Sequence, residues 1–333
     1  MKESINISKS FETTSQRKYI DKLFVTYLSR KNPKNISNSS KNKIFKSLCK
    51  LNKKIIIFLI LLSCITFLCI VFWNLFENDS PKYSINYLNL YIVAHKDFPN
   101  KITNPYYKII CDNKSQLKNK YPLEIIETYK NNELFPKRFG YSEGSKIYYI
   151  WKKYKAKEIS TKYIGFVHYR RVFSFKNKIP NLDKIFNKYG AIISKPFSFK
   201  ISVKTQFCES HICQFLDEIE EIIKENFTEY YSSAKKSLNN KRLNCCNVFI
   251  MKNEDFIKYG EFIFGVLFEF DRRHKIENDD DIKNLIQMKI KKIDTKFESN
   301  YQFRQEGFLM ERLSTIFYNS YFKKTLKYKL SGQ

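Results

Sequence analysis

Four consecutive residues, His168, Tyr169, Arg170 and Arg171, come directly after an apolar run of the chain. A guanidinium group can bind two oxygens of a phosphate at once through two parallel hydrogen bonds, and a histidine adds a further hydrogen-bonding group. We interpret this cluster as a candidate site for a diphosphate or a sugar. A surface arginine pair that bridges to Asp or Glu would give the same pattern, so the residues alone leave both interpretations open.

The histidines and a glycine-containing stretch are further candidates for sites of chemistry. His95 also follows an apolar run, and with His168 and His211 it could supply three ligands to the metal of a hydrolase. The chain contains no H-x-H or H-E-x-x-H spacing, which argues against that class. The stretch GYSEGSK at residues 140–146 lacks one residue between its glycines and has Ser before Lys, so it is not a phosphate-binding P-loop.

The eight cysteines give no complete disulfide pattern. The spacing from Cys208 to Cys213 is not that of a zinc knuckle, and the adjacent Cys245 and Cys246 are poorly placed to face one metal ion together. We interpret the cysteines mainly as core thiols. One disulfide in the C-terminal part of the chain stays open.

The elements that must position these residues alternate along the chain. Apolar runs typical of buried strands lie at residues 87–94, 163–169, 191–193 and 248–251, and amphipathic helical patterns lie at 147–154, 212–223 and 262–270. This alternation predicts an α/β domain with a mixed, mainly parallel sheet flanked by helices. Ligands of such sheets bind at the carboxyl ends of the strands, where His95 and His168 fall.

A membrane anchor is predicted at residues 55–76, which read IIIFLILLSCITFLCIVFWNLF and contain no charged residue. A helix of this length covers a hydrocarbon core of roughly 30 Å. A removable signal peptide would have a shorter apolar core and a small-residue cleavage site. We therefore expect a signal-anchor, with a basic, disordered cytosolic tail at 1–54 and a folded domain at 77–333.

The orientation of the anchor follows from charge. Residues 1–54 carry 14 Lys and Arg against 3 Asp and Glu, whereas Glu77 and Asp79 follow the span. The positive-inside rule then predicts a single-pass type II protein with a cytosolic N-terminus, in the Golgi or endoplasmic reticulum if the source is a eukaryote. The formal net charge of +27 favours anionic ligands, and the placement of the folded domain across the membrane argues against nucleic acid as a partner.

Beyond residue 90 the chain resembles the domain-of-unknown-function 4422 family of capsular polysaccharide biosynthesis, which is related to GT-A glycosyltransferases. Five segments in order carry the resemblance: YIVAHKDF (91–98), YSEGSKIYYIWKK (141–153), YIGFVHYRRVF (163–173), NVFIMKNEDFIKYGEFIFGVLFE (247–269) and RQEGFLMERL (304–313). The chain departs from the family pattern at 142–145, where Ser-Glu-Gly-Ser replaces a Cys-Glu-Leu-Thr run.

The resemblance implies a GT-A-like, Rossmann-like fold and a membrane-anchored glycosyltransferase of the hexosyltransferase type, which moves a sugar from a nucleotide diphosphate sugar to a glycan or polysaccharide acceptor. It implies three groups of site residues. The catalytic candidates are Glu311 as base, His168 and Glu143; the donor and diphosphate candidates are His95, Lys96, Asp97, Tyr169, Arg170 and Arg171; the acceptor or other candidates are His211, Asn247, Arg304, Glu306 and Arg312.

Cofactor and activity are less constrained by the resemblance. Transferases of this fold usually hold a divalent cation, Mn or Mg, on the diphosphate with an Asp-x-Asp pair, but His168 and Arg170 occupy that place here. A divalent cation is therefore left open. The alternative function is a catalytically inactive, transferase-like membrane protein that binds a glycan or a protein partner.

Overall fold

The computed structural model describes residue 58 and residues 61–66, 86–99, 102–292 and 299–331, and the chain divides into two units, Met1–Asp79 and Ser80–Gln333. In the first unit, Phe58 and residues 61–66 are helical with exposed side chains. The tail predicted at 1–54 and most of the span predicted at 55–76 lie outside the described residues. Within the described part, no helix has the length and apolar character needed to cross a membrane.

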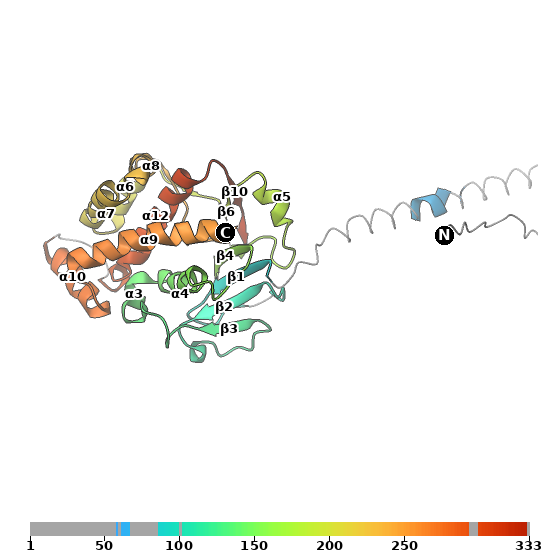
Figure 1. Ribbon diagram of the computed structural model, residues 1–333, viewed down its shortest axis with the longest axis horizontal. Helices are drawn as coiled ribbons and strands as arrows, with labels where there is room; N and C mark the ends of the chain where they lie inside the picture. The colour runs from blue at the N-terminus through green and yellow to red at the C-terminus, as the bar shows by residue number, and fades with distance from the viewer. Residues whose placement is uncertain (1–57, 59–60, 67–85, 100–101, 293–298, 332–333) are drawn as a thin grey trace, which may run out of the picture. The chain divides into compact units, whose positions relative to one another are not determined.

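The second unit is built on a mixed seven-stranded sheet with the order β10-β6-β9-β4-β1-β2-β3 (Figure 1). All neighbours are parallel except β9, which is antiparallel to both β4 and β6. The bounds are Leu88–Val93 (β1), Tyr107–Cys111 (β2), Glu124–Glu127 (β3), Tyr163–His168 (β4), Ala191–Ser194 (β6), Phe249–Lys252 (β9) and Thr325–Tyr328 (β10). The predicted mixed, mainly parallel sheet is confirmed.

Four predicted strands are present, but β2, β3 and β10 were not predicted from the sequence. Each of these three strands carries charged residues among its apolar ones, as in EIIE for β3 and TLKY for β10. The strands β3 and β10 form the two edges of the sheet and are only partly buried. An edge strand needs no continuous apolar run, because one side of it faces away from the sheet.

Two short ladders accompany the main sheet. Strand β5 (Val172–Phe173) pairs with β11 (Leu330–Ser331), and β7 (Phe197–Ser198) pairs with β8 (Arg242–Leu243), both antiparallel. The β5–β11 pair holds the segment that follows β4, and the β7–β8 pair lies just before the cysteines at 245 and 246. Both ladders therefore fix segments next to the carboxyl end of β4.

The helices pack mainly on one face of the sheet. Their bounds are Arg138–Tyr141 (α3), Gly144–Lys155 (α4), Leu182–Phe186 (α5), Val203–Ser210 (α6), Cys213–Asn226 (α7), Thr228–Leu238 (α8), Asn253–His274 (α9), Asp279–Lys292 (α10), Ser299–Gln302 (α11) and Gln305–Tyr321 (α12), with short 3₁₀ turns at Lys114–Gln116 and Phe135–Lys137. The long helix α9 contacts α4, α7 and α12, which places it at the centre of the helical layer (Figure 1).

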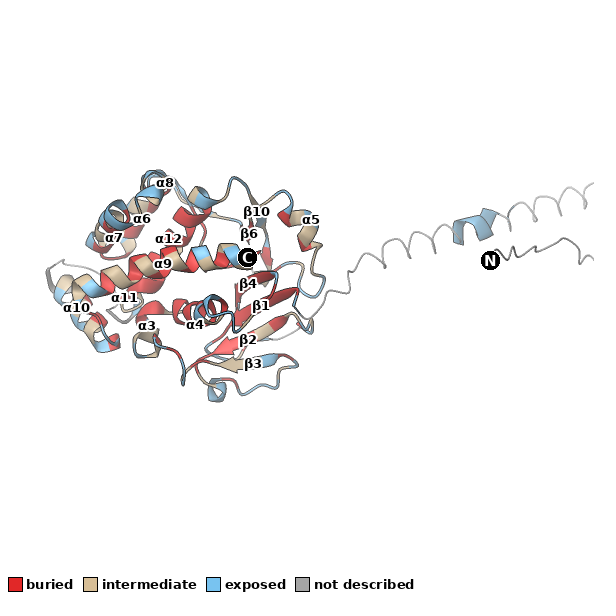
Figure 2. Ribbon diagram, in the orientation of Figure 1, coloured by how far each residue is buried: buried red, intermediate tan, exposed pale blue. Residues whose placement is uncertain are grey.

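Alternation along the strands divides the core in two. Tyr91 and Val93 of β1 lie in the larger core with the helices, whereas Leu90 and Ile92 lie in a second core on the opposite face. Successive strand residues point to opposite faces of a sheet, so both faces of a central strand must be apolar. Figure 2 shows the result: the central strands and the inner sides of the helices are buried, and exposed residues lie outside.

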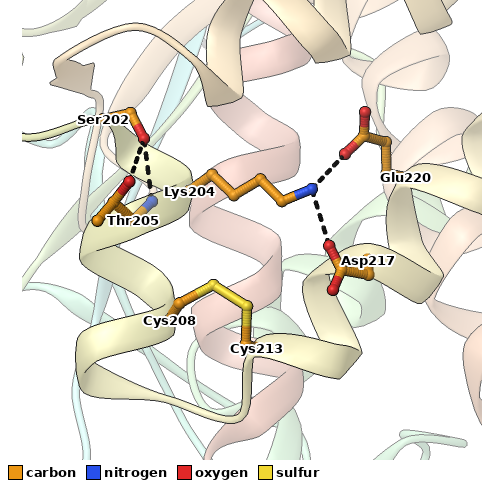
Figure 3. The surroundings of a disulfide bond; sticks show 7 residues. All are labelled: Ser202, Lys204, Thr205, Cys208, Cys213, Asp217 and Glu220. Atoms are coloured by element: carbon orange, nitrogen blue, oxygen red, sulfur yellow. Dashed lines mark hydrogen bonds and ion pairs between the residues drawn. A yellow bond between two sulfur atoms is a disulfide. The ribbon is translucent and has the colours of Figure 1, made fainter.

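A disulfide joins Cys208 at the end of α6 to Cys213 at the start of α7, which decides the alternative that the sequence left open (Figure 3). The same helix pair is tied by Lys204, whose ammonium group lies 2.8 Å from a carboxylate oxygen of Asp217 and 3.0 Å from one of Glu220. Cys111 is a buried free thiol, as expected. The disulfide closes a short loop that carries His211.

Candidate active-site cleft

The turn after β4 arranges the candidate diphosphate-binding residues. The Arg171 amide donates to the His168 carbonyl at 2.8 Å, and the Arg170 amide donates to His168 Nδ1 at 3.1 Å. Because Nδ1 accepts that hydrogen bond, the proton of the neutral imidazole sits on Nε2, which lies 3.6 Å from a carboxylate oxygen of Glu143. Burial lowers the pKa of His168 to about 4, so the ring is neutral near pH 7.

Two adjoining cavities open beside this turn, with Glu143, His168, Arg170 and Arg304 lining both. The first cavity has a volume of about 440 Å³ and is also lined by residues from the ends of β1 and β2 and from α3 and α4, including His95, Asp112, Phe139 and Lys146. The second cavity, of about 330 Å³, is lined on its other side by residues from β7, α6 and α12. Together they form one cleft at the carboxyl edge of the sheet.

Arg170 is the exposed cation of this cleft. It forms no ion pair with any residue that the structure describes, although its guanidinium lies 5.2 Å from the centre of the Tyr169 ring. Tyr169 itself is buried, and its hydroxyl lies 3.4 Å from Nε2 of His95. An unpaired guanidinium held at the mouth of two cavities is placed to bind an anion.

The carboxylates of the first cavity already have cationic partners. Asp112 accepts a hydrogen bond of 2.7 Å from the buried ammonium group of Lys146. Glu143 lies 3.7 Å from Arg304, which also donates to the Ser142 hydroxyl. The residues at the end of β4 are thus a histidine and an arginine, and the nearby carboxylates are paired with Lys146 and Arg304. Divalent cations of this kind need free oxygen ligands, so this set of side chains does not fit one.

Glu311 lines the second cavity from α12. One carboxylate oxygen accepts from the Cys246 amide at 2.8 Å, and the other lies 3.3 Å from Arg312. Arg312 is buried and is held by Gln206, whose side-chain oxygen accepts from it at 2.8 Å. Burial raises the pKa of the half-buried Glu311, while Arg312 opposes the rise. A carboxylate with a raised pKa is suited to proton transfer near neutral pH.

Aromatic rings form the far wall of the second cavity. His211 stacks on Phe308 with a ring separation of 4.0 Å, and Tyr301 stacks on His211 and lies tilted against Phe308 at 4.8 Å. Burial lowers the pKa of His211 to about 4, and its Nδ1 lies 3.2 Å from Gln302. Phe197 and Tyr301 are exposed rings at the rim. Flat apolar faces next to polar groups are typical of a site for an amphipathic ligand such as a sugar.

The structure brings together most of the residues predicted from the sequence. His95, Glu143, His168, Arg170, Arg171, His211, Arg304, Glu311 and Arg312 line one or both cavities. Lys96, Asp97 and Tyr169 line a neighbouring cavity of about 470 Å³ that shares Arg170. Asp97 is tied to the loop beyond it, because its carboxylate accepts from the amides of Lys118 and Asn119.

Two predicted site residues lie outside the lining of these cavities. Asn247 is buried and accepts a hydrogen bond from Ser314. Glu306 is fully buried on the other side of α12, where a Cβ atom on Gly140 would meet its carboxylate, and neither of its oxygens has a hydrogen-bond partner. Both residues therefore have a place in the core.

Sequence reasoning missed Asp112, Lys146 and the two adjacent cysteines. Asp112 directly follows the strand YKIIC. His95 and His168 were identified because they follow predicted strands, and the same reasoning would have identified Asp112 if β2 had been predicted. Cys245, Cys246 and Glu311 bring their ligand atoms within 4.8 Å of one another, which makes them the one group of metal-ligand type among the described residues. Their closeness differs from the expectation for adjacent cysteines. The histidines 95, 168 and 211 form no such group within the described part.

Comparisons with known proteins support the family and the fold. The family model "Domain of unknown function (DUF4422)" matches residues 89–288. The structure is similar to the apo structure of the bifunctional glycosyltransferase WbbM, with a TM-score of 0.52 and 18% identity over 74% of this chain and 45% of that one. The chain thus spans less than half of WbbM. No curated protein matches.

A second solved structure is a more distant match. It is the Mn/GDP form of core-mannan synthase A (CmsA/Ktr4) from Aspergillus fumigatus, with a TM-score of 0.29 and 14% identity over 72% of each chain. At that TM-score the likeness does not bear on the site.

The buried carboxyl of Glu306 predicts a pH-dependent loss of stability. Burial raises its pKa well above the ordinary value of 4.5, and the Asp271 carboxylate adds to the rise. Its contribution to stability is full below the pKa of the unfolded chain and is lost as the pH rises toward the folded pKa, by up to about 1.4 kcal/mol per pH unit.

We expect Glu306→Gln to remove this loss, because the amide stays neutral. Urea unfolding between pH 4.5 and 8 measures the free energy of unfolding. The value for the variant should rise relative to that of the wild type as the pH rises. Glu277→Gln, at an exposed position, is the control. Parallel profiles for Glu306→Gln and the wild type would contradict the prediction.

Proposed function

The chain belongs to the DUF4422 family, and on that premise we propose that its cleft transfers a sugar from a nucleotide diphosphate sugar to a glycan acceptor. The observation that carries the proposal is the turn after β4, where a neutral His168 and an unpaired Arg170 face the space between two cavities. Two cavities that share a cationic wall suit a reaction in which an anionic leaving group and an acceptor meet. The fold shared with WbbM is in keeping with this reaction.

In this proposal the first cavity holds the donor. The Arg170 guanidinium neutralises the diphosphate, and His168 donates its Nε2 proton in a hydrogen bond to a diphosphate oxygen. Both interactions strengthen as the bond between the sugar and the diphosphate breaks, because negative charge collects on the leaving group. Guanidinium and imidazole thus do the work that a cation does elsewhere, and no step is assigned to a metal ion.

The second cavity holds the acceptor. In an inverting transfer, the acceptor hydroxyl attacks the anomeric carbon, the bond to the diphosphate breaks, and the hydroxyl proton passes to Glu311. The Cys246 amide and Arg312 orient the Glu311 carboxylate. Glu143 lies between His168 and Arg304 at the boundary of the two cavities and keeps the cationic wall in place.

Donor binding by Arg170 is tested with nucleotide diphosphates. We expect Arg170→Ala to weaken the binding of the preferred nucleotide diphosphate about 10- to 100-fold, because a charge-assisted hydrogen bond is lost. Thermal stabilisation of the full chain by UDP, GDP and ADP, with Mn²⁺ or with EDTA, measures the change. Arg272→Ala, which removes an exposed guanidinium outside the cleft lining, is the control.

The outcomes of this titration separate the alternatives. Stabilisation that persists in EDTA and depends on Arg170 supports the proposed donor site. Stabilisation that requires Mn²⁺ would mean that a metal ion, and not the Arg170 guanidinium, neutralises the diphosphate. Binding of glycans with no stabilisation by any nucleotide would favour the inactive, glycan-binding alternative.

The role of Glu311 is tested by turnover. We expect Glu311→Gln to lower kcat at least about 100-fold with donor binding unchanged, because the amide cannot take a proton. In the wild type the rate should rise with pH through the raised pKa of Glu311, since the base acts deprotonated. The variant should lose this rise, as followed by release of the nucleotide diphosphate. Glu277→Gln should retain both rate and profile.

We also propose that residues 55–76 anchor the enzyme with its folded unit across the membrane from the N-terminus. The uncharged span and the basic residues before it support this placement. The full chain should stay in the pellet after alkaline carbonate extraction, and a chain lacking 55–76 should be released. In sealed vesicles the folded unit should resist added protease. Extraction of the full chain by carbonate would refute the anchor.

A further inference from the structure

Two adjacent thiols lie side by side on the wall of the second cavity. The Sγ atoms of Cys245 and Cys246 are 3.0 Å apart, closer than two unbonded sulfur atoms in ordinary van der Waals contact. Both cysteines are half-buried. In most extended or helical segments adjacent side chains point away from each other, so this pair needs an unusual backbone.

The backbone that aligns the thiols is held in a strained conformation. Cys246 has φ of 71° and Asn247 has φ of 47°, a region that residues with a Cβ atom seldom adopt. Glu311 fixes the Cys246 amide, Ser314 binds the Asn247 side chain, and Thr315 accepts from the Asn244 amide at 3.0 Å. Contacts with α12 thus maintain the strained turn, as expected for a functional constraint.

Arg171 lies directly over the sulfur pair. Its Nη1 atom is 2.7 Å from the Cys246 sulfur and 3.6 Å from the Cys245 sulfur. The hydrogen bond from the Cys245 thiol lowers the pKa of Cys246, and Arg171 acts in the same direction, while burial and the Glu311 carboxylate oppose the shift. A thiolate beside a guanidinium is the reactive form of cysteine. Cys111 offers a contrast, because burial raises the pKa of that thiol to about 11.

The same unit already contains a disulfide between Cys208 and Cys213 (Figure 3). Disulfides persist in oxidising compartments, so the vicinal pair meets the same conditions. A metal ion shared by Cys245, Cys246 and Glu311 is a different use of these atoms. The guanidinium of Arg171 contacts both sulfurs, and its positive charge opposes a cation at that place.

We propose that Cys245 and Cys246 form a reversible vicinal disulfide, and that its formation releases Arg171 to bind anions in the cleft. The Cys246 thiolate attacks a small-molecule or protein disulfide and expels one of its sulfurs as a thiolate. The Cys245 thiol then loses its proton and attacks the Cys246 sulfur, which expels the second. Two protein thiols are oxidised by two electrons, and one external disulfide is reduced to two thiols.

The effect on Arg171 follows from charge. In the reduced protein the Arg171 guanidinium donates a hydrogen bond to the Cys246 sulfur, and this contact becomes an ion pair when the thiol ionises. The disulfide is neutral, so Arg171 loses its partner, and the positive potential of the cavity wall rises. Formation of the disulfide does not depend on the proposed transfer reaction. The functional role of tighter anion binding, as tighter binding of a diphosphate donor, does rest on that reaction.

Labelling of the full chain tests the disulfide. Trypsin releases residues 243–252, LNCCNVFIMK, which contains both thiols and no other cysteine. The protein is equilibrated with oxidised or reduced glutathione, blocked with N-ethylmaleimide and digested. After oxidation, we expect the peptide to carry no N-ethylmaleimide and to be lighter than the dithiol peptide by two hydrogens. After reduction, it should carry two N-ethylmaleimide groups. Cys245→Ser should instead hold one glutathione on Cys246.

Several results would overturn the proposal. They are double labelling after oxidation, a glutathione adduct that accumulates on the wild-type peptide, or a stoichiometric zinc ion in the purified protein by elemental analysis. Because the wild-type peptide reports directly, the test does not depend on the folding of a variant.

The anion effect is measured with inorganic pyrophosphate. We expect the oxidised full chain to bind pyrophosphate about fivefold more tightly than the reduced chain, with the gain lost at high salt. Cys246→Ser should bind with the higher affinity under both conditions, because it has no thiolate. Cys111→Ser is the control and should respond like the wild type. A formed disulfide without any change in affinity would refute the role of Arg171.

Discussion

The parallel pairing of β1 with β4 is the constraint on which the cleft depends. Its register sets Val93 opposite His168, so the two strands end together and their next residues enter the same space. The strands approach closely because β4 contains Gly165, where a Cβ atom would lie 2.6 Å from the Phe249 carbonyl and 2.7 Å from Leu90. A side chain there would push apart three neighbouring strands. The site therefore rests on the tight packing of β4 against β1 and β9 at Gly165, in the centre of the sheet.

Charge is distributed in the cleft so that one cation stays available. Lys146, Arg304 and Arg312 each have a carboxylate partner among the cleft residues, and Arg171 faces sulfur. Arg170 has none among the described residues. Paired charges keep their geometry because each partner restrains the other, whereas an unpaired guanidinium at the surface has its hydrogen-bonding capacity left for a ligand. The folded domain thus holds a rigid cationic frame with one open position.

The sequence predicted the central strands and the residues at their ends, because long apolar runs mark buried strands. It ranked Glu311 as the base but placed Glu306 in the same site, although only Glu311 lines the cleft. Both lie on α12 five residues apart, and at about 100° per residue they point some 140° apart around the helix axis. One faces the cavity and the other the core. The cysteine turn was beyond prediction, because its left-handed backbone is imposed by distant contacts with α12 rather than by local residue preference.

The order of strands also determines when the cleft can exist during synthesis. The central strands β1, β4 and β9 are adjacent in the sheet but far apart in the chain, and β10, which completes one edge, is almost the last element made. Helix α12, which supplies Glu311 and supports the cysteine turn, also emerges late. Contacts of such high sequence separation form slowly. A nascent or truncated chain without α12 therefore lacks one wall of the second cavity. The complete cleft forms only with the complete domain.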